Sequence, residues 1–260
     1  MRSFSIILGI IISFKCFAQD PGQYERRSFT GGHITLPYRI LFPKNFNTSS
    51  SYPLVIFLHG AFEKGNDNEA QLNIGGRYFL RDKNRDSFPA IVVFPQCPPD
   101  DSWAYFDTET DSASQQVKLI FPFKRQPTEI SKVLMRLIDS LIRLPFVNSR
   151  KVYIAGLSQG AMGVLDLMAR YPYIFAAGLS MCGAGDVNTA KKFAGKIALW
   201  LFHGSKDDVL PVSFSREYYK KLKKENADVR YSEYENVLHN CWVNAFNEPD
   251  LLSWLFSKSR

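Results

Sequence analysis

The sequence predicts an α/β fold in which helices cover both sides of a mostly parallel sheet. Short apolar runs bounded by glycine, proline or polar residues recur along the chain. Amphipathic helical patterns separate these runs. The chain has 260 residues, of which 45% are hydrophobic and 22% charged, so it can bury a sizeable core. No linker divides it, and we expect one domain over residues 19–260.

The composition excludes several classes of protein. The apolar fraction is too high for a disordered chain, and 21 Phe and 12 Tyr are spread along its length. The net charge of +7 comes without any long basic run and without a nucleic-acid motif. The densest cluster, Lys220 to Lys224, is typical of a solvated helix face. We therefore expect no nucleic-acid partner.

The first eighteen residues are typical of a secretory signal peptide. Arg2 precedes an uncharged apolar run over residues 6–14, and Ala18 supplies a small residue at the expected cleavage point. The run is too short to span a bilayer. We expect a secreted or periplasmic product without stable membrane insertion. Lipid attachment at Cys16 is an alternative that the residues Phe14 and Lys15 disfavour.

The expected strands of the sheet are short and continuously apolar. Such runs are typical of strands buried on both faces of a parallel sheet. They are Pro53–Leu58, Ala90–Phe94, Val152–Ala155, Ala177–Met181 and Ile197–Phe202. The segment Ile34–Phe42 is expected to be an antiparallel edge strand, and Val229–Tyr234 is also strand-like.

The expected helices follow a period of 3.6 residues. One carries apolar residues over positions 130–142, with Thr128 placed to cap it and Pro145 to stop it. Another covers Val212 to Glu225, directly after a proline. Residues 97–127 show no such pattern and are expected to be irregular. A connection of that length is usually functional or mobile.

A candidate nucleophile follows the strand Val152–Ala155. The motif Gly156-Leu157-Ser158-Gln159-Gly160 lies between that strand and a helical pattern. In a nucleophile elbow the chain turns sharply from strand to helix, and glycines two positions before and after the serine relieve crowding. The motif alone is weak, but its position between strand and helix makes Ser158 a strong candidate.

A candidate oxyanion hole involves the loop after Pro53–Leu58. In this architecture an oxyanion hole needs two backbone N–H groups, one just after the nucleophile and one from a loop after an earlier strand. Gln159 supplies the first. His59 and Gly60 form a tight loop that leads to Ala61, which would offer the second. We interpret His59 as structural.

A candidate acid follows the strand Ile197–Phe202. A carboxylate on such a loop can orient an imidazole and stabilise it once protonated. The segment His203-Gly204-Ser205-Lys206-Asp207-Asp208 offers two acids, of which the spacing favours Asp207. Asp208 and Asp186 remain alternatives.

The candidate base follows by elimination among four histidines. His33 precedes the core sheet, and His59 and His203 belong to His-Gly turns. His239 follows the strand-like Val229–Tyr234 and precedes an expected helix. The resulting chain order of serine, aspartate and histidine distinguishes one hydrolase arrangement from the two other familiar ones.

These segments resemble the α/β-hydrolase carboxylesterases, in the branch with prolyl-oligopeptidase-like, feruloyl and acetylxylan esterases. The resemblance covers roughly residues 31–257 and rests on LHGAFEKGNDN, FPQCP with Trp103, GLSQG, HGSKDDVLP and LHNCW. It implies a sheet of about eight strands, catalysis by Ser158, Asp207 and His239, and an oxyanion hole from Ala61 and Gln159. Relatives commonly have Gly before the catalytic histidine, where this chain has Leu238.

The predicted function is that of a secreted serine esterase acting on small soluble esters or on acetyl or feruloyl esters of polysaccharides. Only about fifteen residues separate Met181 from Ile197, too few for a large cap domain. Five aromatic residues are candidates for a substrate pocket, with ordinary packing as the alternative: Trp103, Tyr105 and Phe106, and also Phe62 and Trp242 beside the candidate catalytic loops. A peptidase and a non-catalytic binding protein on the same fold are the competing hypotheses.

We expect no cofactor and no metal site. The chain has no CxxC motif and no zinc-ligand spacing. Cys97, Cys182 and Cys241 remain after signal cleavage. They fit either one disulfide with a free thiol or three buried thiols.

Overall fold

The computed structural model describes residues 21–110 and 117–260, so the expected signal peptide lies outside the described residues. Eight strands form the main sheet. They are β1 (Glu25–Gly31), β2 (Ile34–Leu41), β3 (Tyr52–Leu58), β4 (Ile91–Pro95), β7 (Val147–Leu157), β8 (Ala177–Met181), β9 (Ala198–Gly204) and β10 (Val229–Tyr234).

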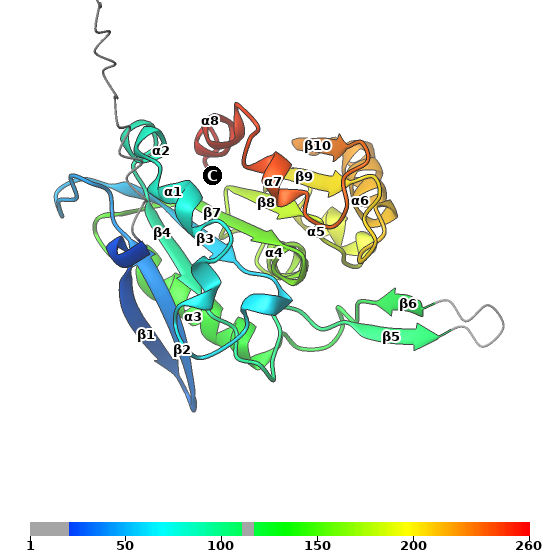
Figure 1. Ribbon diagram of the computed structural model, residues 1–260, viewed down its shortest axis with the longest axis horizontal. Helices are drawn as coiled ribbons and strands as arrows, with labels where there is room; N and C mark the ends of the chain where they lie inside the picture. The colour runs from blue at the N-terminus through cyan, green and yellow to red at the C-terminus, as the bar shows by residue number, and fades with distance from the viewer. Residues whose placement is uncertain (1–20, 111–116) are drawn as a thin grey trace, which may run out of the picture.

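The sheet is mostly parallel (Figure 1). Its strand order is β1-β2-β4-β3-β7-β8-β9-β10. Six strands run parallel to one another: β4, β3, β7, β8, β9 and β10. At one edge β2 pairs antiparallel with β4, and β1 pairs antiparallel with β2. The predicted fold class is confirmed, and each strand expected from an apolar run is present. The sequence analysis missed β1 because its residues are polar and mostly exposed. The expectation that Ile34–Phe42 is the edge strand is therefore wrong, since β2 pairs with both β1 and β4.

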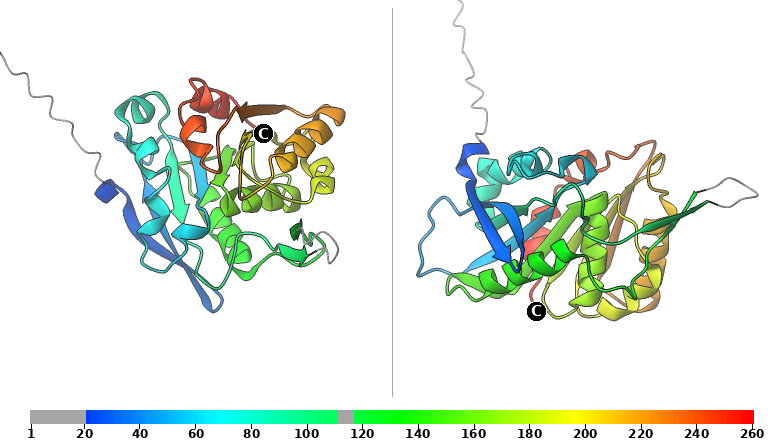
Figure 2. Two further views of the ribbon diagram at one scale, coloured as in Figure 1. Left: turned by 45° about the vertical axis from the view of Figure 1, so that its right-hand side comes forward. Right: turned by 90° about the horizontal axis from the view of Figure 1, so that it is seen from below.

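Helices cover both faces of the sheet (Figure 2). They are α1 (Gly76–Leu80), α2 (Asp82–Ser87), α3 (Glu129–Ile142), α4 (Gln159–Arg170), α5 (Ala190–Phe193), α6 (Ser213–Lys224), α7 (Trp242–Ala245) and α8 (Leu251–Phe256). Buried side chains of α3, α4 and α6 share one core, and those of α1 and α8 share the other. Strand β3 serves both, since Leu54 and Ile56 lie in the first core and Val55 and Phe57 in the second.

Helix α3 forms where the apolar period predicted it. Thr128 caps its start, because Oγ1 accepts a hydrogen bond from the N–H of Ser131 at 3.2 Å. Between β8 and β9 the chain forms only a short 3₁₀ helix, Val187–Thr189, and α5. That connection holds no large cap domain, as expected.

The segment over residues 97–127 is not irregular throughout. It contains an antiparallel ribbon of β5 (Asp107–Thr110) and β6 (Val117–Ile120), which projects from the body of the molecule (Figure 1). The strands are short and β5 is mostly exposed, so no apolar run marked them. Arg125 anchors the base through an ion pair to Asp107 at 2.9 Å.

No helix within residues 21–110 and 117–260 is long and apolar enough to cross a membrane. Cys97, Cys182 and Cys241 are free, buried thiols, which is the second of the two expected arrangements.

Candidate active site

Ser158 lies in the sharp turn between β7 and α4. Its backbone φ of 52° and ψ of −120° are strained for a residue with a side chain. Its N–H donates to the carbonyl oxygen of Met181 at 2.9 Å, which ties the turn to the end of β8. The turn thus has the geometry of a nucleophile elbow.

The two glycines of the motif are required by close backbone packing. A Cβ atom at Gly156 would lie 2.6 Å from the carbonyl carbon and oxygen of Gly160. A Cβ atom at Gly160 would collide with the carbonyl oxygen of Leu58, at the end of β3. Real Cβ atoms do not approach backbone atoms so closely, so any side chain here would push the elbow away from β3.

Three side chains from separate loops form one hydrogen-bonded chain. Nε2 of His239 lies 2.9 Å from Oγ of Ser158. Nδ1 of His239 lies 2.8 Å and 2.9 Å from the two carboxylate oxygens of Asp207. Because a carboxylate only accepts, Nδ1 carries the hydrogen and Nε2 is free to accept from the Ser158 hydroxyl. The structure therefore brings together the three predicted catalytic residues.

The alternatives to Asp207 lie elsewhere. Asp208 is exposed to solvent. The carboxylate of Asp186 accepts from the N–H of Asn188 at 3.0 Å and caps a 3₁₀ helix. The side chain of Asp207, by contrast, is fully buried.

The carboxylate of Asp207 has several hydrogen-bond donors. Its Oδ1 accepts from the N–H groups of Val209 at 3.0 Å and Leu210 at 2.8 Å. Its Oδ2 lies 3.1 Å from Nε2 of His203. Burial alone raises the pKa of Asp207, but the hydrogen bonds from His203, His239 and these N–H groups outweigh burial. They hold the pKa well below its usual range, so the carboxylate stays charged.

The loops that carry the acid and the base brace each other. The N–H of Lys206 donates to the carbonyl oxygen of Val237 at 2.9 Å, and the N–H of Asn236 donates to Oγ of Ser205 at 2.9 Å. Gly204 lies so close beneath the histidine loop that a Cβ there would collide with the carbonyl oxygen of Val237. Direct packing therefore fixes this loop without a glycine before His239.

The expected oxyanion-hole residues lie beside Ser158. Ala61 begins a short 3₁₀ helix and Gln159 begins α4, so neither N–H has a partner within its own helix. Both residues line the same groove as Ser158. His59 shapes this loop: its Nδ1 lies 2.6 Å from the carbonyl oxygen of Gly60, and its Nε2 accepts from the N–H of Cys97 at 2.9 Å.

A family model described as phospholipase/carboxylesterase matches residues 47–249, which is most of the chain. The chain belongs to the phospholipase/carboxylesterase family. A solved structure of a thermostable esterase is 32% identical, with a TM-score of 0.82 over 92% of this chain and 64% of that one. The chain thus spans less than two thirds of that esterase. A comparison with curated proteins found no match.

More distant structures share the α/β-hydrolase fold alone. A ferulic acid esterase is 15% identical, with a TM-score of 0.65 over 90% of this chain and 98% of that one. A dipeptidyl peptidase 4 from Porphyromonas gingivalis is 14% identical, with a TM-score of 0.65 over 90% of this chain and 35% of that one.

Of the five aromatic residues expected to line a substrate pocket of this carboxylesterase-family protein, Phe106 lines the groove at Ser158 and the other four do not. Trp103 is fully buried, and its Nε1 donates to the carbonyl oxygen of His59 at 3.1 Å, so that expectation is wrong. Phe62 is 98% exposed beside Ala61. Trp242 packs edge-on against the ring of His239 at 5.8 Å. Neither Phe62 nor Trp242 lines the groove at Ser158.

The groove has a volume of about 820 Å³ and runs between the β5–β6 ribbon and α6. Besides the candidate catalytic and oxyanion residues, its lining is mainly apolar. That lining consists of Phe106, Lys118, Leu119, Met162, Val209, Leu210, Pro211, Ser213, Phe214 and Glu217. Of these residues the sequence analysis expected only Phe106 in a substrate pocket, and it missed the others.

One group of side chains within the described residues has metal-ligand spacing. Ligand atoms of Cys182, Asp207 and His239 all lie within 4.8 Å of one another. Cys182 is fully buried, and burial raises the pKa of its thiol well above the usual value. A protonated thiol is a poor metal ligand, and the other two side chains already bond to each other. We assign no metal to this group.

Proposed function

We propose that this protein is a serine esterase that hydrolyses carboxylic esters through an acyl-enzyme on Ser158. The observation that carries the proposal is the hydrogen-bonded chain from Ser158 through His239 to Asp207, at the mouth of an apolar groove. Membership of the phospholipase/carboxylesterase family supports it.

In the proposed mechanism His239 takes the proton of the Ser158 hydroxyl as the oxygen attacks the ester carbonyl. Asp207 holds the imidazole in the required tautomer and stabilises the imidazolium that forms. The N–H groups of Ala61 and Gln159 would bind the developing oxyanion. His239 then protonates the leaving alcohol, and water releases the acyl group by the reverse proton path. These steps need no cofactor.

The proposed substrates are small soluble esters, or acetyl or feruloyl esters of carbohydrates. The absence of a cap between β8 and β9 supports access for a soluble or polymer-linked carrier. The resemblance to feruloyl and acetylxylan esterases is the reason for naming carbohydrate esters. A peptidase remains a competing hypothesis that the same experiment addresses.

The test measures hydrolysis of aryl acetates, feruloylated and acetylated oligosaccharides, and a prolyl peptide. Ser158→Ala is expected to lower the best of these activities by on the order of 10⁶. Activity close to that of the unaltered protein would refute the proposal. Cleavage of the peptide alone would favour the peptidase instead.

We also propose that the protein is exported, because Arg2, the apolar run over residues 6–14 and Ala18 are typical of a signal peptide. Amino-terminal sequencing of the product from the periplasm or the medium tests this. We expect a start near Gln19. An intact amino terminus in the cytoplasm would refute export.

A further inference from the structure

The groove beside Ser158 has two apolar walls and an apolar floor. Met162 and Leu210 form the floor and belong to one small buried cluster. Leu119 from β6 and Phe214 from α6 pack against that cluster from either side. Phe106, which is 37% exposed, extends the ribbon wall toward solvent. The floor and walls therefore fit a hydrocarbon group.

The charged residues of the groove do not favour an ionic ligand. Lys118 on the ribbon and Glu217 on α6 both line the groove, and both are exposed to solvent. Their opposite charges cancel, and neither is buried against the floor. A phosphate or carboxylate bound along the groove would find no desolvated cation, so an uncharged group fits better.

The position of His239 indicates which half of an ester enters the groove. His239 must protonate the leaving alcohol, so the alcohol half lies beside that imidazole. The groove is lined by Ser158, Ala61 and Gln159, but by no residue from the loop 237–242 that carries His239. The acyl half, attached to the carbonyl carbon above Ser158, is therefore the half directed along the groove.

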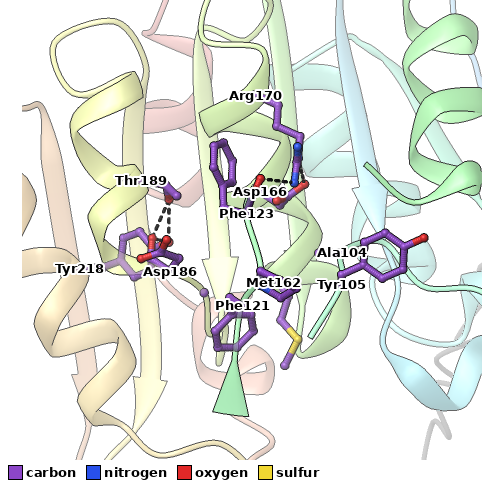
Figure 3. Close-up of a pocket in the computed structure, with 12 residues that line it drawn as sticks. Ala104, Tyr105, Phe121, Phe123, Met162, Asp166, Arg170, Asp186, Thr189 and Tyr218 are labelled. Carbon is purple, nitrogen blue, oxygen red and sulfur yellow. Dashed lines mark hydrogen bonds and ion pairs between the residues drawn. The ribbon is translucent and has the colours of Figure 1, made fainter. Parts of the chain in front are cut away.

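A neighbouring hollow is too small to be the acyl site. It shares one lining residue, Met162, with the groove. Figure 3 shows the residues that line this hollow. Its volume of about 20 Å³ holds about one water molecule. Asp166 and Arg170 close part of it with an ion pair of 2.6 Å.

We propose that the groove between the β5–β6 ribbon and α6 is the acyl-binding site, that it takes an uncharged aryl or medium-chain acyl group, and that Phe106 and Leu119 determine this selectivity. The proposal rests on the proposed esterase function. An acetyl group would leave most of the groove unfilled. Each additional methylene group buried there raises kcat/KM by up to about fourfold.

The test compares kcat/KM for p-nitrophenyl hexanoate and p-nitrophenyl acetate, which differ only in the acyl half. We expect the hexanoate-to-acetate ratio to exceed one, and to fall by about tenfold in Phe106→Ala or Leu119→Ala. Tyr173→Ala removes an aromatic side chain that is 67% exposed and lies outside the groove, and it should leave the ratio unchanged. Thermal unfolding verifies that each variant is folded.

A second pair of substrates, hexyl acetate and ethyl acetate, varies the alcohol half. The acyl assignment would be overturned if Phe106→Ala and Leu119→Ala both left the hexanoate-to-acetate ratio of kcat/KM unchanged. It would also be overturned if they changed the ratio of kcat/KM for hexyl acetate and ethyl acetate instead. Either result would leave the esterase function intact. Failure to cleave any of the four esters would count against the esterase function itself and would remove the basis of the assignment.

Discussion

Nε2 of His203 lies 3.1 Å from Oδ2 of Asp207, the same oxygen that lies 2.8 Å from Nδ1 of His239. One buried carboxylate is therefore shared between two imidazoles. Nε2 of His203 is also 3.0 Å from the carbonyl oxygen of Leu210. Both neighbours only accept, so Nε2 carries the hydrogen, and Nδ1 accepts from the hydroxyl of Ser215 at 2.7 Å.

We expect His203→Phe to lower kcat by about ten- to a hundredfold, because Asp207 loses a hydrogen bond to its charged form. KM should change little, since His203 is fully buried and does not itself line the groove. His203→Gln can still donate and should recover part of the loss. Steady-state kinetics check this; equal effects on kcat and KM in a folded Phe variant would contradict a positioning role.

Asp207→Asn is expected to lower kcat by about 10⁴, because an amide in place of the carboxylate no longer enforces the required tautomer of His239. Asp208→Asn is the matched control. Its side chain is exposed, so kcat should stay within about twofold of the unaltered protein. A larger loss of kcat in Asp208→Asn than in Asp207→Asn would mean that Asp208, and not Asp207, is the acid that orients His239.

The sequence predicted those features of the site that depend on local patterns. Ser158 lay in a motif with its own backbone requirements, and elimination among four histidines led to His239. Apolar runs predicted the central strands, because strands buried on both faces must be apolar throughout.

Features that depend on contacts distant in sequence were not predictable in the same way. Trp103 was expected in a pocket because it is aromatic and lies in a long connection. Its burial follows from packing against the loop of His59 and against Gly163, which no local pattern encodes. His203 was interpreted only as part of a turn, since its contact with Asp207 depends on how that loop folds back. Strand β5 is polar and mostly exposed, and Lys118 interrupts the four-residue β6, so neither has the continuous apolar run that predicted the buried strands.

We predict a loss of stability in mild acid that depends on His59. Burial lowers the pKa of His59 to about 4, whereas the pKa of a histidine in an unfolded chain is about 6.5. As the pH falls between these values the unfolded chain takes up a proton and the folded one does not, so the free energy of unfolding decreases. Titration of His59 over this range lowers the free energy of unfolding by roughly 3 kcal/mol in total.

Urea unfolding at a series of pH values between 7 and 4 measures this decrease in the free energy of unfolding. His59→Gln cannot titrate, so its stability should fall less steeply with decreasing pH, even if it is less stable at pH 7. The same slope in both proteins would show that His59 is not the group responsible.

The close packing of the elbow on β3 gives a last prediction. Gly160→Ala would drive a methyl group into the carbonyl oxygen of Leu58, and relief of the clash would move Ser158 away from the loop of Ala61. We expect hydrolysis of p-nitrophenyl acetate to fall by at least about a hundredfold, because the nucleophile would be misplaced, together with a lower melting temperature. Gly195→Ala is the matched control, since Gly195 has a φ of 72° but no atom within 4 Å of an added Cβ. Its cost should be only the backbone strain of about 1–2 kcal/mol, with kcat preserved. Equal activities in the two alanine variants would mean that the elbow tolerates displacement from β3.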